Sequence, residues 1–147
     1  IAKSPVVPVG RLPLIRRGYE AHILGDYVQS IHLLIPQIER TLVELIYRTG
    51  GTSVKPFRSG SGRGVMQSKS LNDALDDAGV TKALGPDLRM YLVAALSHPK
   101  GHNIRNEVCH GLWNPEHFTK SASERVVHSM TAVSLLRSRP SETQSDS

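Results

Sequence analysis

The apolar side chains between residues 26 and 48 recur at intervals of three and four residues, and this spacing constrains the fold most strongly. Such a period places them on one face of a helix, which must be buried against other helices. Asp26 suits the N-cap, and Thr49-Gly50-Gly51 offers a left-handed C-cap. Pro36 lies inside the helix, so we expect a bend at residues 32–35. The apolar positions are Val28, Ile31, Leu34, Ile35, Ile38, Leu42, Leu45 and Ile46.

The rest of the chain predicts further helices and no sheet. Alternation of apolar and polar residues, which is typical of strands, is nowhere sustained, and no internal repeat is visible. Residues 79–85 are expected to form a connector. We therefore predict an all-α bundle of five or six helices. The expected helices, besides the one above, cover residues 14–24, 71–77 with Ser70 as N-cap, Pro86 to about Leu96, 103–112, and Ser121 or Ser123 to about Leu136.

A length of 147 residues fits one domain. Residues 1–13 are expected to form an extended lead-in, and residues 14–138 the single helical domain, which contains a basic loop at residues 51–69. Residues 139–147 are polar and are expected to be a disordered tail. The chain starts with Ile1 rather than Met, so we expect it to be a piece of a longer protein.

The sequence does not fit several classes of protein, among them membrane-spanning and disulfide-stabilised proteins. A membrane span needs about 20 consecutive apolar residues, and no stretch approaches that length. The single cysteine, Cys109, cannot form an internal disulfide and is expected to be a small packing residue. No signal segment is visible, so we expect a cytoplasmic protein. Pro99 and Gly101 would misalign His98 and His102, so we expect no metal and no other cofactor.

Positive charge is concentrated in one part of the chain. The net charge is +5, from 18 basic and 13 acidic residues. The glycine-rich segment 58–64 contains Arg58 and Arg63, and flexible cations of this kind suit contacts with phosphate. A solvated linker would have the same composition. The basic residues between Leu45 and Asn72, where no acidic residue occurs, are Arg48, Lys55, Arg58, Arg63 and Lys69.

The predicted helix at residues 103–112 places a cation among apolar residues. At 100° per residue, Arg105 falls within the apolar arc of this helix. A guanidinium does not lose its proton, so Arg105 needs a carboxylate, a phosphate or a second subunit beside it. Glu39 is the first candidate for such a carboxylate. The apolar arc contains Ile104, Val108 and Leu112, and the polar strip contains Asn103, Asn106 and His110.

The segment Arg105-Asn106-x-x-x-His110 resembles the R-N-x-x-x-H signature of the HEPN superfamily (higher eukaryotes and prokaryotes nucleotide-binding domains). These are small helical bundles that include many RNA-cleaving toxins. Gly111-Leu112 follows the histidine, and the segment lies on the penultimate predicted helix. Gly25-Asp26-Tyr27 and residues 32–39 also resemble one bacterial branch, so that the resemblance covers about residues 20–137.

This resemblance implies a metal-independent ribonuclease in which two motif helices meet in a homodimer. His110 would act as general base or acid on the RNA 2′-hydroxyl, because imidazole can both take and give a proton near neutral pH. Arg105 would hold the scissile phosphate, and Asn106 would orient the imidazole or the phosphate. The expected products carry a 2′,3′-cyclic phosphate and a 5′-hydroxyl. The domain would be a toxin or antiphage effector, with an antitoxin or a neighbouring domain as a further partner.

The remaining candidates surround this motif. Glu39 and His32 would support the site, although His32 on an apolar stretch is more typical of a core residue. Trp113 is expected to anchor the core, with base stacking as the alternative. A non-catalytic dimerisation or RNA-binding module of a larger protein is the alternative function, and a regulatory or scaffold domain is a third. The expected substrate-binding residues are Lys100, His102, Asn103, Arg58 and Arg63.

Overall fold

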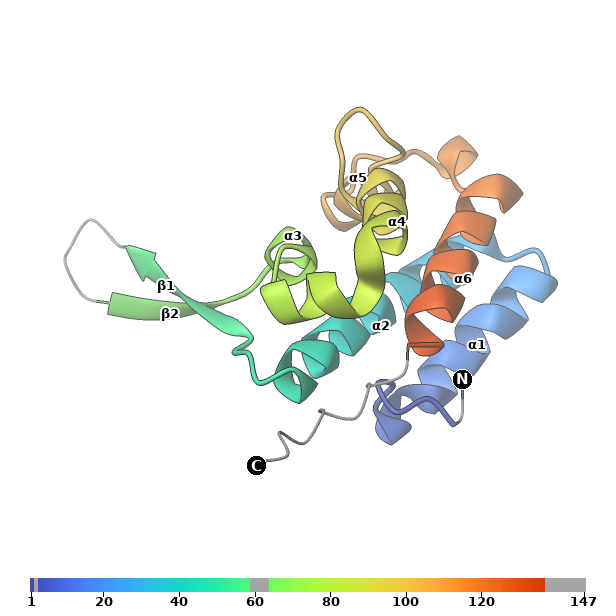
Figure 1. The fold of residues 1–147 in the computed structure, drawn as a ribbon. Coiled ribbons are helices and arrows are strands. Elements are labelled where there is room, and N and C mark those ends of the chain that lie inside the picture. The colour runs from blue at the N-terminus through green and yellow to red at the C-terminus, as the bar shows by residue number, and fades with distance from the viewer. Residues whose placement is uncertain (2, 59–63, 137–147) are drawn as a thin grey trace, which may run out of the picture.

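The computed structural model describes residues 1, 3–58 and 64–136 (Figure 1). Most of these residues are helical, as the sequence predicted, and they include six α-helices. None of these helices is long and apolar enough to cross a membrane. The helices are α1 (Leu12–Ile23), α2 (Tyr27–Arg48), α3 (Leu71–Leu75), α4 (Ala78–Leu96), α5 (Ile104–Cys109) and α6 (Lys120–Ser134), with 3-10 turns η1 (Val9–Arg11) and η2 (Pro115–His117).

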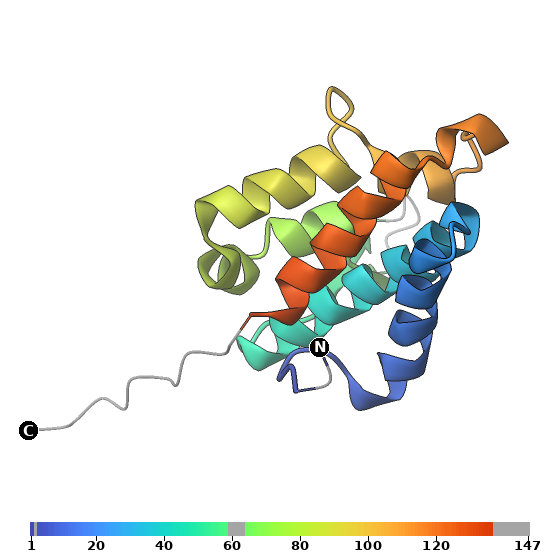
Figure 2. The same cartoon turned by 90° about the vertical axis from the view of Figure 1, so that its right-hand side faces the viewer.

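Helix α2 is the central element, and the other helices pack around it. The Asp26 carboxylate accepts a hydrogen bond from the Gln29 backbone N–H at 2.9 Å, which caps the first turn. The helix then continues through Pro36 to Arg48. Helices α1 and α6 lie along it (Figure 2), and α3 and α4 also contact it. Every apolar position predicted for this helix is buried except Val28, which is 47% exposed.

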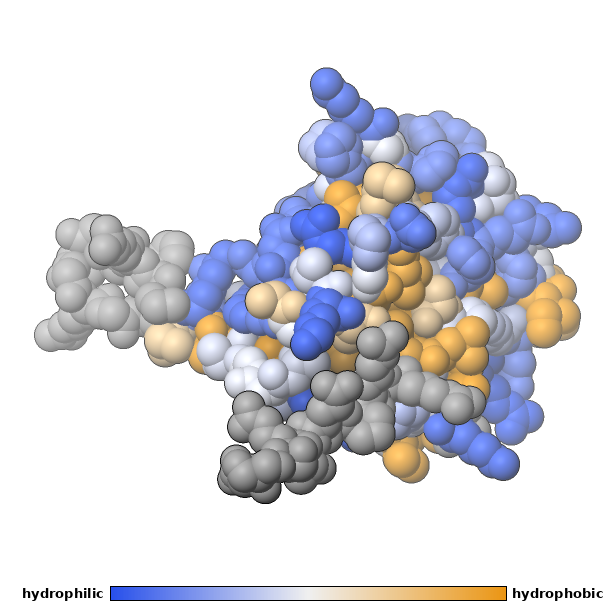
Figure 3. Space-filling view, in the orientation of Figure 1, coloured by the Kyte–Doolittle hydropathy of each residue, from blue (hydrophilic) through white to orange (hydrophobic). Residues whose placement is uncertain are grey.

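Close packing between α1 and α2 depends on Gly18. A Cβ at this position would lie 2.6 Å from the Leu34 side chain, so only glycine fits without movement. On the face seen in Figure 3, the surface is largely hydrophilic with separate apolar patches. The side chains that fill the centre include Ile31, Leu34, Ile38, Leu42, Ile46, Leu75, Leu92, Leu96, Ile104, Val126 and Met130.

The prediction that residues 51–69 form a loop was wrong, because most of this segment is a β-hairpin. Strand β1 (Val54–Arg58) pairs antiparallel with β2 (Gly64–Ser68), with Val54 opposite Ser68 and Arg58 opposite Gly64. The hairpin projects away from the helices (Figure 1). Its strands contain β-branched and aromatic residues on either side of the glycine-rich segment, a local pattern that favours a hairpin.

Two ion pairs fasten the base of the hairpin to the helices. Lys55 Nζ lies 2.7 Å from the Asp73 carboxylate, and Lys69 Nζ lies 2.8 Å from Asp77. Asp73 also accepts hydrogen bonds from the Ser70 hydroxyl and backbone N–H in a capping box. Lys55 first, and then Ser70, lower the pKa of Asp73 to about 2. Two basic residues of this segment are therefore neutralised within the chain.

The low pKa of Asp73 predicts how the fold responds to acid. Because its ordinary value is 3.8, ionised Asp73 stabilises the fold fully above that pH, and this contribution is lost as the pH falls towards about 2. We expect the free energy of unfolding to fall less steeply from about pH 4 to pH 2 in Asp73→Asn than in the wild type. Denaturant unfolding at a series of pH values measures this slope.

Asp87→Asn is the matched control for that experiment. Asp87 is an exposed residue of α4 whose carboxylate makes no ion pair within the described part of the chain. Its replacement should leave the slope as in the wild type. Equal slopes for Asp73→Asn and the wild type would contradict the assignment of acid sensitivity to the hairpin anchor.

The predicted boundaries at the start of the chain also need correction. The expected extended lead-in, residues 1–13, contains the turn η1 and the first residues of α1. Pro13 lies in the first turn of α1, where its missing N–H leaves no helical hydrogen bond unmade. The helix therefore starts two residues earlier than the expected 14–24.

The connector predicted at residues 79–85 is mostly helical. Asp77 caps it by accepting hydrogen bonds from the backbone N–H groups of Gly79 and Val80. A break does occur at Gly85, whose φ of 73° is left-handed, and Pro86 begins the second part as predicted. An aspartate at residue 77 is a typical N-cap, and it is the sequence signal for a helix that starts at Ala78.

The last two helices differ from the prediction at their ends. Helix α5 covers only Ile104–Cys109 of the expected residues 103–112. Thr119 caps α6, because its hydroxyl oxygen accepts a hydrogen bond from the Ala122 backbone N–H at 3.2 Å. Ser123, one of the expected caps, is instead fully buried. The expected tail at residues 139–147 lies outside the described residues.

Candidate active site

Helix α5 carries the motif and is fixed by tight turns at both ends. Before it, His102 donates its backbone N–H to the Ala94 carbonyl of α4 at 2.8 Å. The chain then enters α5 through Asn103, the one described non-glycine residue with a positive φ, at 50°. After it, Gly111 with a φ of 67° turns the chain away. The helix is six residues long, so its position depends on these turns.

Arg105 forms an ion pair with Glu39 of α2, which is the carboxylate that the sequence suggested. Its Nε donates to Glu39 Oε1 at 2.5 Å, and its Nη1 donates to Asn106 Oδ1 at 3.2 Å. The Arg105 side chain is 23% exposed and that of Glu39 is 32% exposed. Burial lowers the pKa of Arg105, but the hydrogen bond and charge of Glu39 outweigh it and raise the pKa. Arg105 is therefore a fixed cation.

One edge of the Arg105 guanidinium remains available. The group has five N–H donors, and the bonds to Glu39 and Asn106 use two of them. Its Nη2 has no hydrogen-bond partner among the described residues. A partly exposed guanidinium held on one edge can donate from the other edge to a phosphate oxygen.

Within the described residues, the Asn106 side chain makes no hydrogen bond to the His110 imidazole, and orienting that ring was one of the two roles, beside orienting the phosphate, that the resemblance implied. Its Nδ2 donates to the Ser97 carbonyl at 3.2 Å and to Asn103 Oδ1 at 2.8 Å, which uses both amide hydrogens. Asn106 therefore fastens α5 to the end of α4 and supports Arg105 through its carbonyl. Of the two partners of Nδ2, Asn103 lies three residues before Asn106, and Ser97 lies nine residues before it at the end of α4.

His110 stands at the C-terminal end of α5 with an exposed side chain. Its backbone N–H donates to the Asn106 carbonyl at 3.0 Å, which closes the last turn. The imidazole is thus free to meet a ligand from solvent. His110 follows Arg105 by five positions, which is about 140° around a helix, so the two side chains leave α5 in different directions.

Cys109 is exposed, which corrects the prediction that it is a packing residue. It lies close enough to Arg105 and Glu39 for both charges to act on its thiol. The protein atoms around the sulfur raise the pKa of Cys109, Glu39 adds to this effect, and Arg105 opposes it. The thiol therefore stays protonated near neutral pH, which argues against a thiolate nucleophile.

The predicted substrate-binding residues do not all converge. Lys100 and His102 are exposed in the turn before α5, and Asn103 donates from its Nδ2 to Glu107 Oε1 at 3.0 Å. Arg58 ends β1 in the hairpin that projects away from the helices (Figure 1), so its backbone lies apart from α5. Arg63 lies outside the described residues.

Aromatic rings beside the motif form a group that the sequence analysis missed. His32 is exposed rather than in the core, and its ring stacks on Phe118 with 5.3 Å between centroids. Trp113 is half-buried, and the centroid of its ring system lies 5.3 Å from that of Phe118 and 6.0 Å from that of His117. Phe118 was not singled out because no spacing rule connects residue 118 with residue 32. We call these four residues the aromatic cluster.

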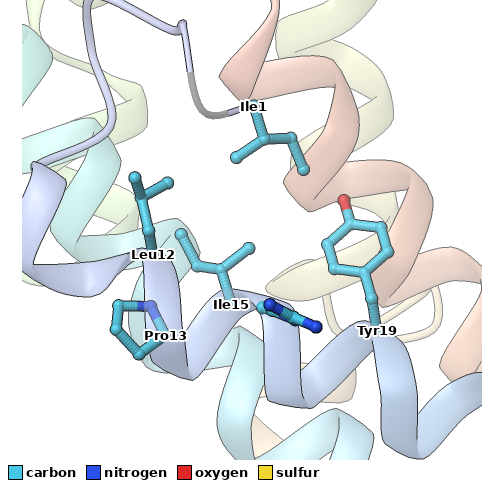
Figure 4. A pocket seen from close by; sticks show the side chains of 6 residues that line it. Ile1, Leu12, Pro13, Ile15 and Tyr19 are labelled. Atoms are coloured by element: carbon cyan, nitrogen blue, oxygen red, sulfur yellow. The ribbon is translucent and has the colours of Figure 1, made fainter.

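In the part of the chain that the structure describes, neither a metal cluster nor the apolar pocket at the start of α1 involves the predicted site residues. No group of three or more His, Cys, Asp and Glu side chains among the described residues is placed to hold a metal ion. An apolar pocket of about 500 Å³ near the start of α1 contains none of the predicted site residues (Figure 4). It is lined by Ile1, Leu12, Pro13, Ile15, Arg16 and Tyr19.

Comparison of the chain with protein-family models, with curated proteins and with solved structures found no match. The resemblance to HEPN domains therefore stays a prediction from the motif. An assignment of function depends on the geometry of α5 and its neighbours.

Proposed function

We propose that this chain is a metal-independent RNA endonuclease of the HEPN type. The observation that supports it best is the state of Arg105, a fixed and partly exposed cation with one free edge, on the same helix as an exposed His110. A cation that grips phosphate and an imidazole that moves protons are the two groups that cleavage by the RNA 2′-oxygen requires. Such a nuclease would serve as a toxin or antiphage effector.

The proposed reaction balances without a cofactor. One imidazole removes the proton of the 2′-hydroxyl, and the 2′-oxygen attacks the adjacent phosphorus. The bond from phosphorus to the 5′-oxygen breaks, and an imidazolium gives that oxygen a proton. Arg105 stabilises the negative charge on the phosphate oxygens during the exchange. The products carry a 2′,3′-cyclic phosphate and a 5′-hydroxyl.

A homodimer would bring the two groups together. Because Arg105 and His110 leave α5 about 140° apart, Arg105 of one protomer could act with the partner subunit's His110 in a shared cleft. Leu112, three residues after the end of α5, is 63% exposed although it was assigned to the apolar arc. An exposed leucine beside a motif helix fits a surface that a second copy covers.

Total RNA and purified tRNA, each incubated with the chain in EDTA, test this proposal. We expect fragments with 2′,3′-cyclic phosphate and 5′-hydroxyl ends, because no step uses a metal ion. Intact RNA, or fragments with 5′-phosphate ends, would contradict the proposed mechanism. Sedimentation of the same sample measures whether the chain is dimeric.

The ion pair with Glu39 favours one alternative, a non-catalytic RNA-binding or dimerisation module. Glu39 already compensates the Arg105 charge, so that Arg105 is satisfied without phosphate. A catalytic Arg105 should gain affinity for RNA in Glu39→Gln, because the competing carboxylate charge is removed. A module that uses the pair only for structure should lose stability in this variant and cleave no RNA.

A further inference from the structure

The aromatic cluster consists of two ring pairs that meet at a right angle. His32 of α2 stacks on Phe118 at an interplanar angle of 21°, and His117 of η2 stacks on Trp113 at 27°. The inner rings, Phe118 and Trp113, contact each other edge to face at 86°. Helix α2, the residues after α5 and the turn η2 thus place four rings in contact with one another.

Each pair has a half-buried inner ring and an exposed outer ring. Phe118 and Trp113 pack against the core, whereas the residues His32 and His117 are exposed. An exposed ring whose one face is stacked on a partner offers its other face to solvent. The cluster therefore presents two flat aromatic surfaces on the outside of the molecule.

Hydrogen bonds fix which ring atoms the two histidines present. His32 Nδ1 lies 2.8 Å from the Val28 carbonyl, which only accepts, so this nitrogen carries the proton and Nε2 of the neutral ring is an acceptor. His117 Nδ1 accepts from the Asn114 backbone N–H at 3.2 Å, so its Nε2 carries the proton and is a donor. The two exposed rings therefore offer opposite hydrogen-bonding edges.

The cluster adjoins the motif along the chain and along α2. Trp113 follows His110 by three residues, and His32 precedes Glu39, the partner of Arg105, by seven. Seven residues are two helical turns, so His32 and Glu39 lie on one face of α2, about 10.5 Å apart along its axis. Neighbouring nucleotides of a single strand can bridge a separation of this size.

We propose that the aromatic cluster is a base-stacking surface for single-stranded RNA, placed beside the phosphate-binding Arg105. This inference rests on the proposed function and adds the substrate class: unpaired nucleotides, whose bases stack on His32 and His117 while a neighbouring phosphate meets Arg105. Stacking on exposed rings tolerates different bases, because each base has an aromatic face. Duplex RNA keeps its bases paired and offers none of these faces.

The sole tryptophan makes the proposal measurable. Trp113 is the only tryptophan in the chain, so its fluorescence reports on this cluster alone. We expect a short 2′-O-methyl RNA, which cannot be cleaved by its 2′-oxygen, to quench this fluorescence. His32→Ala and His117→Ala should each weaken binding about 5- to 150-fold, which corresponds to about 1–3 kcal/mol for one base–aromatic stack.

Two matched controls separate stacking from charge and from general effects. An abasic oligonucleotide of the same length has the same phosphates and no bases, so it should bind weakly and leave the fluorescence unchanged. His128→Ala removes an exposed histidine of α6 that contacts Tyr91 edge to face at 4.8 Å, and it should bind as the wild type does. Equal binding of both oligonucleotides, or unchanged binding in both cluster variants, would overturn the proposal.

Cleavage of unmodified RNA, measured beside the fluorescence, separates this inference from the proposed function. Quenching by 2′-O-methyl RNA without cleavage would support the stacking surface and contradict the nuclease. Cleavage that is unaffected by His32→Ala and His117→Ala would support the nuclease and overturn the stacking surface.

Discussion

Replacement of His110 by alanine is expected to abolish RNA cleavage while the fold persists. The His110 side chain is exposed and makes no hydrogen bond within the described residues, so its removal costs the fold little. Loss of a general acid or base lowers rates about 10²- to 10⁴-fold. Single-turnover cleavage measures the rate, and circular dichroism with sedimentation measures fold and assembly. Cleavage at the wild-type rate by a folded His110→Ala variant would contradict the proposed mechanism.

Arg105 gives the companion test, with a complication that the ion pair introduces. Arg105→Ala should reduce cleavage by a similar factor, but it also leaves the partly buried Glu39 carboxylate without its partner. The double variant Arg105→Ala with Glu39→Gln removes that unpaired charge. If both variants are folded and inactive, the loss of activity belongs to the guanidinium. If the double variant recovers cleavage, Arg105 serves only to neutralise Glu39.

Helix α2 was predictable because a single physical requirement dictates its sequence. A central helix must present apolar side chains every third or fourth position, and a carboxylate at Asp26 must meet the free N–H groups of the first turn. Both features are local and periodic. Val28 is the exception, because it is 47% exposed although Ser30 in the same turn is buried and accepts a hydrogen bond from Ser123 of α6.

The hairpin and the start of α4 were missed because short local signals compete there with composition. Glycine and basic residues at 51–69 suggested a loop, but strand pairing between β1 and β2 needs only five residues on each side. The same composition bias hid the cap at Asp77, which starts a helix across two glycines. Charge pattern alone did not show that Lys55 and Lys69 are engaged by acids of the next helices.

In the site, the sequence predicted that Arg105 requires a counter-charge, but it did not predict the contacts of Asn106 and His32. A helical wheel shows that Arg105 requires a counter-charge, and Glu39 was the leading acid for it, as the ion pair shows. The same wheel placed Asn106 near His110, yet the amide bonds to the backbone of the preceding loop. His32 was expected either to support the site or, as is more typical when the neighbours in sequence are apolar, to lie in the core. Only the tertiary structure brings Phe118 beneath its ring.

Gly101 holds the motif helix in place, and its replacement should damage both stability and activity. A Cβ on Gly101 would lie 2.2 Å from the Ala94 carbonyl oxygen and 3.0 Å from its carbon, which are backbone atoms that cannot rotate away. That oxygen also accepts the His102 N–H, so the turn must shift to make room. We expect Gly101→Ala to lower the free energy of unfolding by about 1–3 kcal/mol.

A shift of this turn would move α5 with it, because Asn103 and Asn106 tie the helix to the turn and to the Ser97 carbonyl. Gly101→Ala should therefore lower cleavage even at temperatures where the variant is folded, since small displacements of a catalytic group cost rate steeply. Gly10→Ala is the matched control, because a Cβ there meets nothing within 4 Å. Thermal unfolding and cleavage should be unchanged in that control. If Gly101→Ala behaves like Gly10→Ala in both measurements, the turn does not set the position of Arg105.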